Sequence, residues 1–245
     1  LEVTYILATL KAGPNTLCAG LLHDVLEDTD MTKEEMAAEF NVEVAEIVDG
    51  VTKISKLKYR TKEKALASNH EKLLIAMSKD IRVILVKLVD RLHNMRTIEF
   101  QPEDKRKRIA KETLDLYAPL AHRLGMYRLK AELEDLSFKA IDPETYYEIS
   151  SDIVSKKSER EDDIEAMRKL LVEMLEKNNI GNYQIKGRIK NIYSIYNKMV
   201  TKSKRLDDIY DLLALRVIVN SVGDCYHVLG LIHSIWTPLP KRFKD

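Results

Sequence analysis

The segment at residues 79–95 constrains the fold of this chain more than any other, because apolar residues occupy nearly every side of it. Its aliphatic side chains are Ile81, Val83, Ile84, Leu85, Val86, Leu88, Val89 and Leu92. A helix that is hydrophobic all round is buried among other elements, so this segment predicts a bundle with the helix in its middle. Asp90 lies in this apolar segment, where a carboxylate is costly to bury without a partner.

The first 145 residues are predicted to be almost entirely helical. Few turn residues interrupt them, in keeping with 8 Gly and 6 Pro in the 245 residues. Helices are expected at 1–10, at 17–26 with Asn15 or Thr16 as the cap, after a capping box at 32–35, at 41–51, at 105–124 and at 127–140. The strongly charged segment 56–68 is expected to be a loop or an exposed helix.

The pattern changes in the last part of the chain. Residues 144–179 predict one or two long charged helices, and the alternation at 183–190 is typical of a half-buried strand. A helix at 192–200, a buried strand at 213–219 and a helix at 225–236 are expected to follow. We therefore expect a mostly α protein with an all-α part at 1–145, a helical linker region at 146–180 and an α/β part at 181–245.

Composition excludes several classes of protein. Lys and Arg number 40 against 39 Asp and Glu, and this balance argues against a dedicated nucleic-acid binder. No apolar run approaches the roughly 18 residues of a membrane span, and no signal peptide is visible. Cys18 and Cys225 match no disulfide or metal framework, so a reduced, cytoplasmic protein is expected. Because the chain begins at Leu1 and ends without a closing element, we expect a fragment.

His23, Asp24 and Asp90 form the first candidate site. All three polar groups lie in segments predicted to be apolar helices, where charge needs a partner or a metal. A neutral imidazole and two carboxylates without Cys suit Mn²⁺, Mg²⁺ or Fe²⁺ better than structural zinc. The competing interpretation is that His23 is an ordinary core histidine and that Asp90 pairs with Arg91 or a distant arginine.

Four further polar residues accompany this set. Glu27 and Asp28 follow His23 and Asp24 by four residues, so they are expected within reach of a metal-bound water as general base or acid. Asn94 and Thr97 follow Asp90 on its predicted helix face and offer neutral hydrogen bonds to a ligand.

A second candidate site lies on the strand predicted at 183–190. Lys186, Arg188 and Lys190 are expected on one face, where an anion such as a triphosphate would relieve their repulsion. Ser194 and Lys198 extend this surface, and Asp211 could hold Mg²⁺. Arg216 is expected inside the buried strand and therefore to need a partner or ligand. The competing interpretation is an ordinary solvated basic face.

Several stretches resemble the long bacterial RelA/SpoT homologues, which make and degrade the alarmones ppGpp and pppGpp. The resemblance covers essentially the whole chain and is carried by HDVLEDT at 23–29, VDRLHNMRT at 89–97, YAPLAHRLG at 117–125, GRIKNIYSIYNKM at 187–199 and DIYDL at 208–212. It implies an HD-type alarmone hydrolase domain at 1–145, the helical region, and a partial nucleotidyltransferase-like (p)ppGpp synthetase domain at 181–245.

For the hydrolase part, the resemblance implies removal of the 3′-pyrophosphate of (p)ppGpp at a Mn²⁺ site. His23, Asp24 and Asp90 match metal ligands, Glu27 and Asp28 match the catalytic acidic pair, and Asn94 and Thr97 match nucleotide contacts. The family's first metal ligand and its guanine-holding segment would lie upstream of Leu1. His93 and His122 are expected to be structural.

For the synthetase part, the resemblance implies pyrophosphate transfer from ATP to GDP or GTP, with Mg²⁺ at Asp211. Arg188 would stack on the adenine, while Lys190, Ser194 and Lys198 would meet the phosphates. The closing RFKD, with Lys244, resembles the basic motif of bifunctional members. Asn191 departs from the usual His, and further synthetase residues would lie beyond residue 245.

Two other functions remain open from the sequence. One is an HD phosphohydrolase acting on another nucleotide, and the other is a non-catalytic nucleotide-sensing module. The resemblance places ribosome contact in C-terminal regions of the parent protein, so no direct nucleic-acid binding is expected from this segment. Two opposed activities on one chain are expected to be reciprocally regulated, because otherwise ATP would be consumed in a futile cycle.

Overall fold

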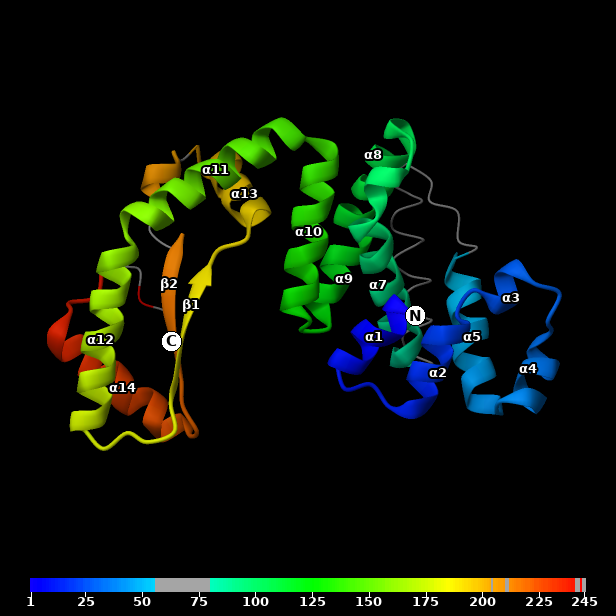
Figure 1. The fold of residues 1–245 in the computed structure, drawn as a ribbon, viewed down its shortest axis with the longest axis horizontal. Coiled ribbons are helices and arrows are strands. Elements are labelled where there is room, and N and C mark those ends of the chain that lie inside the picture. Colours follow the sequence, from blue (N-terminus) through cyan, green and yellow to red (C-terminus); the bar gives the residue numbers. More distant parts are fainter. Residues whose placement is uncertain (56–79, 204, 210–211, 241–242, 244–245) are drawn as a thin grey trace. The chain divides into compact units, whose positions relative to one another are not determined.

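The fold is mostly helical, as the sequence predicts, with one small sheet (Figure 1). The computed structural model describes residues 1–55, 80–203, 205–209, 212–240 and 243. The predictions for the charged segment 56–68, for Asp211 and for Lys244 lie outside these residues. The chain divides into two compact units, Leu1–Pro143 and Glu144–Asp245. Residues 146–180, predicted as a separate linker region, cluster with the second unit.

Unit 1 is a helical bundle. Its described elements are α1 (Glu2–Thr9), α2 (Pro14–Leu22), α3 (Val25–Asp28), α4 (Lys33–Glu39), α5 (Val42–Ser55), α7 (Ile81–Arg96), the 3-10 turn η1 (Ile98–Phe100), α8 (Glu103–Glu112), the π-helical turn η2 (Thr113–Tyr117), α9 (Ala118–Arg123) and α10 (Tyr127–Ile141).

Helix α7 is the central helix of this bundle, which confirms the prediction for residues 79–95. It packs against α1, α2, α5 and α10, and its side chains Val86, Leu88 and Val89 are fully buried. At the crossing with α5, a Cβ added at Gly50 would lie 2.7 Å from Val83 Cγ2. The absence of a side chain at Gly50 therefore lets the two helices approach closely.

Side-chain caps fix where several of these helices begin. The capping box predicted at Thr32 is present, since Thr32 Oγ1 accepts from the Glu35 amide and Glu35 Oε2 accepts from the Thr32 amide. Asn41 accepts from the Val44 amide at 2.8 Å in front of α5. Asp80 caps α7 by accepting from the Arg82 amide at 2.8 Å.

The continuous helix predicted at 17–26 is wrong. Helix α2 ends at Leu22, His23 and Asp24 form a turn, and α3 begins at Val25. The start also differs, because Gly13 occupies the cap position and Pro14 the first turn, where its missing amide hydrogen costs nothing. Likewise, the helix predicted at 105–124 is interrupted by the π-helical turn η2.

Unit 2 packs helices on a two-stranded antiparallel sheet. Its described elements are α11 (Pro143–Glu159), α12 (Glu161–Lys177), β1 (Gln184–Ile189), α13 (Ile192–Lys202), the 3-10 turn η3 (Leu206–Asp208), β2 (Leu213–Ile218) and α14 (Val222–Ile235). The strands pair from Gln184 with Ile218 to Ile189 with Leu213.

One face of this sheet belongs to the core of unit 2. Ile185, Leu215 and Val217 pack against a buried cluster that includes Leu175 of α12 and Val228 of α14. The strand predicted at 183–190 is present, but it is more exposed than predicted, because Ile185 is partly buried whereas Gly187 and Ile189 are exposed. Strand β2 is not buried on both faces as expected. Its residues alternate between partly buried and exposed, so Arg216 lies exposed rather than inside an apolar strand.

Candidate functional sites

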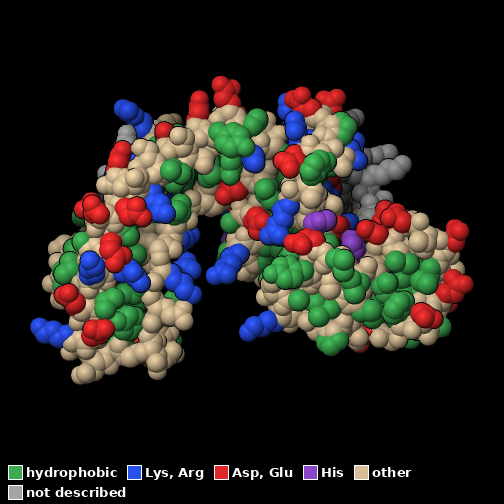
Figure 2. All heavy atoms as spheres, in the orientation of Figure 1, with side chains coloured by type: hydrophobic (Ala, Val, Ile, Leu, Met, Phe, Trp, Pro, Cys, Tyr) green, Lys and Arg blue, Asp and Glu red, His purple; other side chains and the backbone are tan. Residues whose placement is uncertain are grey.

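His23, Asp24 and Asp90 lie together in unit 1. His23 Nε2 lies 3.1 Å from Asp24 Oδ2 and 3.6 Å from Asp90 Oδ1. The side chains of His23 and Asp90 are 14% and 8% exposed, whereas Asp24 is more open to solvent. Figure 2 shows histidine side chains beside carboxylates on the visible face of this unit. Two sequence segments that are far apart thus bring one imidazole and two carboxylates to one place.

The turn between α2 and α3 positions His23 and Asp24. The His23 Nδ1 atom lies 3.0 Å from the Gly20 carbonyl oxygen, so Nδ1–H donates to it and Nε2 faces the carboxylates. A hydrogen bond of this kind from the second ring nitrogen fixes tautomer and ring orientation in metal-binding histidines. The break that the sequence did not predict is therefore what directs His23 Nε2 toward Asp90.

Two side chains of α7 hold the carboxylate of Asp90. Lys87 Nζ donates to Oδ2 at 2.7 Å, and Asn94 Nδ2 donates to Oδ1 at 3.0 Å. Lys87 was not singled out from the sequence, although its position three residues before Asp90 on a helix is a signal for such a pair. Arg91, the alternative partner for Asp90, instead pairs with Glu112 at 3.2 Å and lies over the Tyr117 ring.

The protonation of these groups reflects their mutual contacts. Burial favours a raised pKa for Asp90, but the hydrogen bond to His23 and the charge of Lys87 outweigh it and lower the pKa of this carboxyl group. The hydrogen bond to Asp90 raises the pKa of His23. Partial burial, with the carboxylates of Asp90 and Asp28 nearby, raises the pKa of Asp24. Asp90 is thus an anion, and a cation is favoured beside it.

The donor chemistry of this group fits a divalent cation. A neutral Nε2 lone pair and carboxylate oxygens are ligands that Mn²⁺ and related ions accept. Within the described residues, however, no group of three or more His, Cys, Asp or Glu side chains is arranged so that it could hold a metal ion. His23, Asp24 and Asp90 lie close together but do not by themselves form a metal site.

The other predicted residues of this site lie around it. Glu27 and Asp28 are exposed on the short helix α3, and Asp28 is close enough to act on the ionisation of Asp24. Asn94 and Thr97 are exposed near the end of α7, but Asn94 also binds Asp90. The Thr97 hydroxyl donates to the His93 carbonyl at 3.2 Å.

The predicted basic face of unit 2 is larger than the sequence indicated. Lys186 lies directly opposite Arg216 in the strand register, and Arg188 lies opposite Ala214 on the same face. Lys186, Arg188 and Arg216 are exposed, and none forms an ion pair within the described ranges. Lys190 follows β1, while Ser194 and Lys198 lie one turn apart on α13 and are partly buried. Lys and Arg side chains gather beside this sheet in Figure 2.

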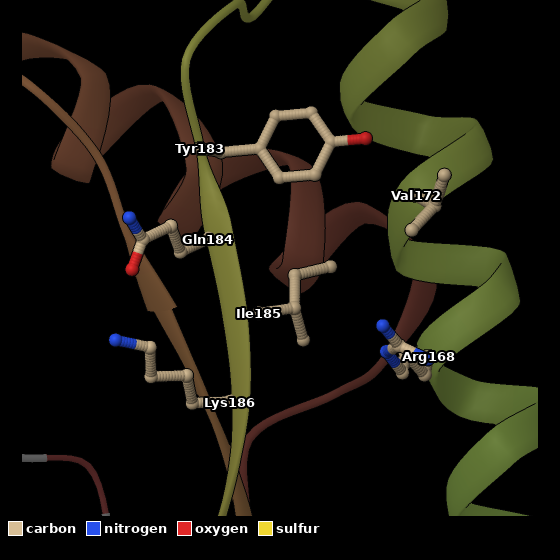
Figure 3. Close-up of a pocket in the computed structure, with 6 residues that line it drawn as sticks. All are labelled: Arg168, Val172, Tyr183, Gln184, Ile185 and Lys186. Atoms are coloured by element: carbon tan, nitrogen blue, oxygen red, sulfur yellow. The ribbon is translucent and has the colours of Figure 1, made fainter.

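A pocket of about 480 Å³ lies between β1 and α12 (Figure 3). Tyr183 and Ile185 point toward Arg168 and Val172 of α12, whereas Lys186 points to the other side of the strand. Lys186 nevertheless belongs to the lining of the pocket, so the pocket and the basic face share this residue of β1.

Comparison with known proteins matches both units. The family model described as "HD domain" matches residues 1–127, and that described as "Region found in RelA / SpoT proteins" matches residues 187–245. A guanosine-3′,5′-bis(diphosphate) 3′-pyrophosphohydrolase of Spiroplasma citri is 48% identical over 100% of the chain and 33% of its own length. The bifunctional (p)ppGpp synthase/hydrolase SpoT of Escherichia coli K12 is 47% identical over 99% of the chain and 34% of its own length. A GTP pyrophosphokinase of Myxococcus xanthus is 46% identical over 100% of the chain and 33% of its own length.

The helical fold of unit 1, the pairing of His23 with Asp24 and the family-model match over residues 1–127 define an HD-domain protein. Because the likeness to these relatives continues through the second unit, the chain belongs to the RelA/SpoT homologues. The chain spans about a third of the length of the curated relatives it matches. Membership in this family implies dependence on a divalent metal. Within the described part of the chain, no helix is long and apolar enough to cross a membrane.

Proposed function

We propose that unit 1 hydrolyses the 3′-pyrophosphate of (p)ppGpp to give GDP or GTP and pyrophosphate, using Mn²⁺ held in part by His23, Asp24 and Asp90. The observation that carries this proposal is the approach of the Asp24 and Asp90 carboxylates to within 3.6 Å of His23 Nε2. The names of the relatives, 46–48% identical to this chain, support the choice of substrate.

Each residue of the site has its own proposed role. The metal supplies Lewis acidity and lowers the pKa of its water, which phosphoester hydrolysis requires. Gly20 orients His23, while Lys87 and Asn94 hold Asp90. Glu27 and Asp28, exposed beside Asp24, would move protons to and from the reacting groups. The amide of Asn94 and the hydroxyl of Thr97 would contact the nucleotide.

Product analysis of the full-length protein with ppGpp and Mn²⁺ tests this function. We expect GDP and pyrophosphate, and we expect a chelator to stop their release. Turnover of a different nucleotide but not of ppGpp would favour an HD phosphohydrolase of other specificity. Binding of ppGpp without turnover in the presence of Mn²⁺ would favour a nucleotide-sensing module and contradict the proposal.

We propose that unit 2 contributes to the synthesis of (p)ppGpp by pyrophosphate transfer from ATP to GDP or GTP. The like charges of Lys186 and Arg216, directly opposite on one sheet face, favour an anionic ligand there. Arg188 would stack on adenine, Lys190, Ser194, Lys198 and Lys244 would bind phosphates, and Asp211 would hold Mg²⁺. Arg188→Ala in the full-length protein should abolish synthesis, and unchanged synthesis would contradict this role.

The partners and location of the protein follow from this function. We propose that it acts in the cytoplasm, where its nucleotide substrates occur, and that ribosome contact is made by regions outside residues 1–245. Cosedimentation with ribosomes should be observed for the full-length protein and not for residues 1–245. Cosedimentation of residues 1–245 alone would contradict this assignment.

A further inference from the structure

We propose that the pocket between β1 and α12 in unit 2 binds a small aromatic carboxylate, with the ring of the ligand against Tyr183 and its carboxylate on Arg168. The lining residues are Arg168, Val172, Tyr183, Gln184, Ile185 and Lys186 (Figure 3). All six lie between the ranges that the two family models match, 1–127 and 187–245. Neither the sequence motifs nor these matches assign a ligand to the pocket.

The pocket has the size and the walls of a small-molecule site. Its volume of about 480 Å³ lies within the roughly 300–1,000 Å³ that is usual for ligand pockets. Tyr183 and Ile185 point from one side of the extended chain toward α12, where Val172 faces them (Figure 3). One phenol ring and two aliphatic side chains thus form an apolar wall, and a flat hydrocarbon body bound there would be removed from water.

Arg168 gives the pocket a cationic end. It lies one turn before Val172 on α12, so the two side chains share one face of the helix. The side chain of Arg168 is 53% exposed, and its Nη1 atom lies 3.5 Å from Oε2 of Glu165, which is too long for a strong hydrogen bond. Arg168 therefore keeps donors that can bind a ligand carboxylate through two parallel hydrogen bonds.

The other lining residues limit the ligand to a single negative charge. Among the described residues that line the pocket none is acidic, and the ammonium group of Lys186 points to the other side of β1 (Figure 3). The Tyr183 hydroxyl lies 3.5 Å from Oε1 of Glu176, so the polar end of this ring faces a carboxylate. A polyanion such as a nucleoside triphosphate would leave most of its charge without a partner here, whereas an aromatic carboxylate would not.

The test uses 2-naphthoate as the probe and measures its binding to the full-length protein by calorimetry. Two related compounds separate the parts of the site, since 2-naphthamide has the same rings without the charge and acetate has the charge without the rings. We expect 2-naphthoate to bind with a Kd below about 1 mM and each of the other two compounds to bind at least about tenfold more weakly.

Three variants place this binding in the pocket. Arg168→Gln should weaken the binding of 2-naphthoate by about tenfold and leave that of 2-naphthamide unchanged. Glu165→Gln is the matched control, because it breaks the same ion pair but keeps the guanidinium group, and it should bind 2-naphthoate at least as tightly as the wild type. Val172→Trp, which would fill the pocket, should abolish the binding of both naphthyl compounds.

Circular dichroism checks the folding of each variant, and Arg168→Gln with its control provides the measurement if Val172→Trp does not fold. The inference would be overturned by a wild-type protein that does not bind 2-naphthoate below about 1 mM. Equal affinity for 2-naphthoate and 2-naphthamide, or equal binding of 2-naphthoate by the wild type and Arg168→Gln, would also overturn it. These results leave the proposed hydrolysis and synthesis of (p)ppGpp untouched, because those functions are measured separately.

Discussion

At the scale of single residues, Asp90 is the group on which the candidate metal site depends. It is the least exposed of the three acidic and imidazole side chains, and it contacts His23, Lys87 and Asn94 at once. Asn at this position would keep the shape of the side chain but remove the negative charge that a cation requires.

Asp90→Asn should therefore lower Mn²⁺-dependent release of pyrophosphate from ppGpp by at least about 100-fold in the full-length protein. The measurement is the initial rate at saturating Mn²⁺. Asp104→Asn, an exposed acid-to-amide change on α8, is the matched control and should retain the wild-type rate. Equal rates for the two variants would remove Asp90 from the site.

At the scale of elements, the contact between α5 and α7 holds the helix that carries Asp90. A Cβ at residue 50 would lie 2.7 Å and 3.1 Å from the two methyl carbons of Val83. Gly50→Ala should destabilise unit 1 by about 1–3 kcal/mol, the usual cost of overpacking a core. Gly230→Ala on α14, where nothing lies within 4 Å, should instead be neutral or stabilising by up to about 1 kcal/mol. Thermal unfolding measures the change in stability of the two variants, which should be a loss for Gly50→Ala and no change or a gain for Gly230→Ala.

The start of α7 has a pH-dependent component. Hydrogen bonds from Arg82 lower the pKa of Asp80, which caps this helix. Because the folded state binds the proton less well than the unfolded state, this group stabilises α7 above a pH of about 4 and loses that contribution as pH falls. The pair is partly exposed, so the effect is below about 1 kcal/mol.

Asp80→Asn keeps a capping oxygen but removes the charge. Hydrogen exchange of the Arg82 and Val83 amides should be faster in the variant than in the wild type at neutral pH, and the difference should shrink in acid. If the difference in exchange rate between variant and wild type grew as pH fell, ionised Asp80 would not stabilise the start of α7, and the prediction would be wrong.

At the scale of the whole molecule, the two units are expected to carry separable activities. Each has its own buried cluster, and the two candidate sites lie in different units. In the full-length protein, Asp90→Asn should abolish hydrolysis and leave synthesis within about twofold, since substitutions in separately packed units with no shared partners act independently. Arg188→Ala should have the reverse effect. Loss of both activities in either variant would contradict separate sites.

Regulation would appear as a coupling between these sites. Rates of ppGpp hydrolysis should fall when a non-hydrolysable ATP analogue and GDP occupy the synthetase, because a ligand at one site biases the equilibrium of the other. Equal hydrolysis rates with and without these ligands would count against coupling.

The sequence predicted the presence of helices and strands better than the residues at which they begin and end. Uninterrupted apolar residues identified α7 as the central helix, and period-two alternation identified β1. The break at His23 and Asp24 was missed because the flanking residues Leu22 and Val25 continue the helical pattern. The exposure of Arg216 was also missed, since an apolar run does not tell which strand face is covered. Lys87 was not predicted as the partner of Asp90, because an arginine, Arg91, lies next to Asp90 in the sequence.

The most direct test of the metal site is a crystal of the full-length protein soaked in Mn²⁺, with diffraction recorded at the manganese absorption edge. The account predicts an anomalous peak about 2.0–2.3 Å from His23 Nε2, from an oxygen of Asp24 and from Asp90 Oδ1. Bound Mn²⁺ elsewhere, with His23 and Asp90 still in direct contact and no peak between them, would contradict it.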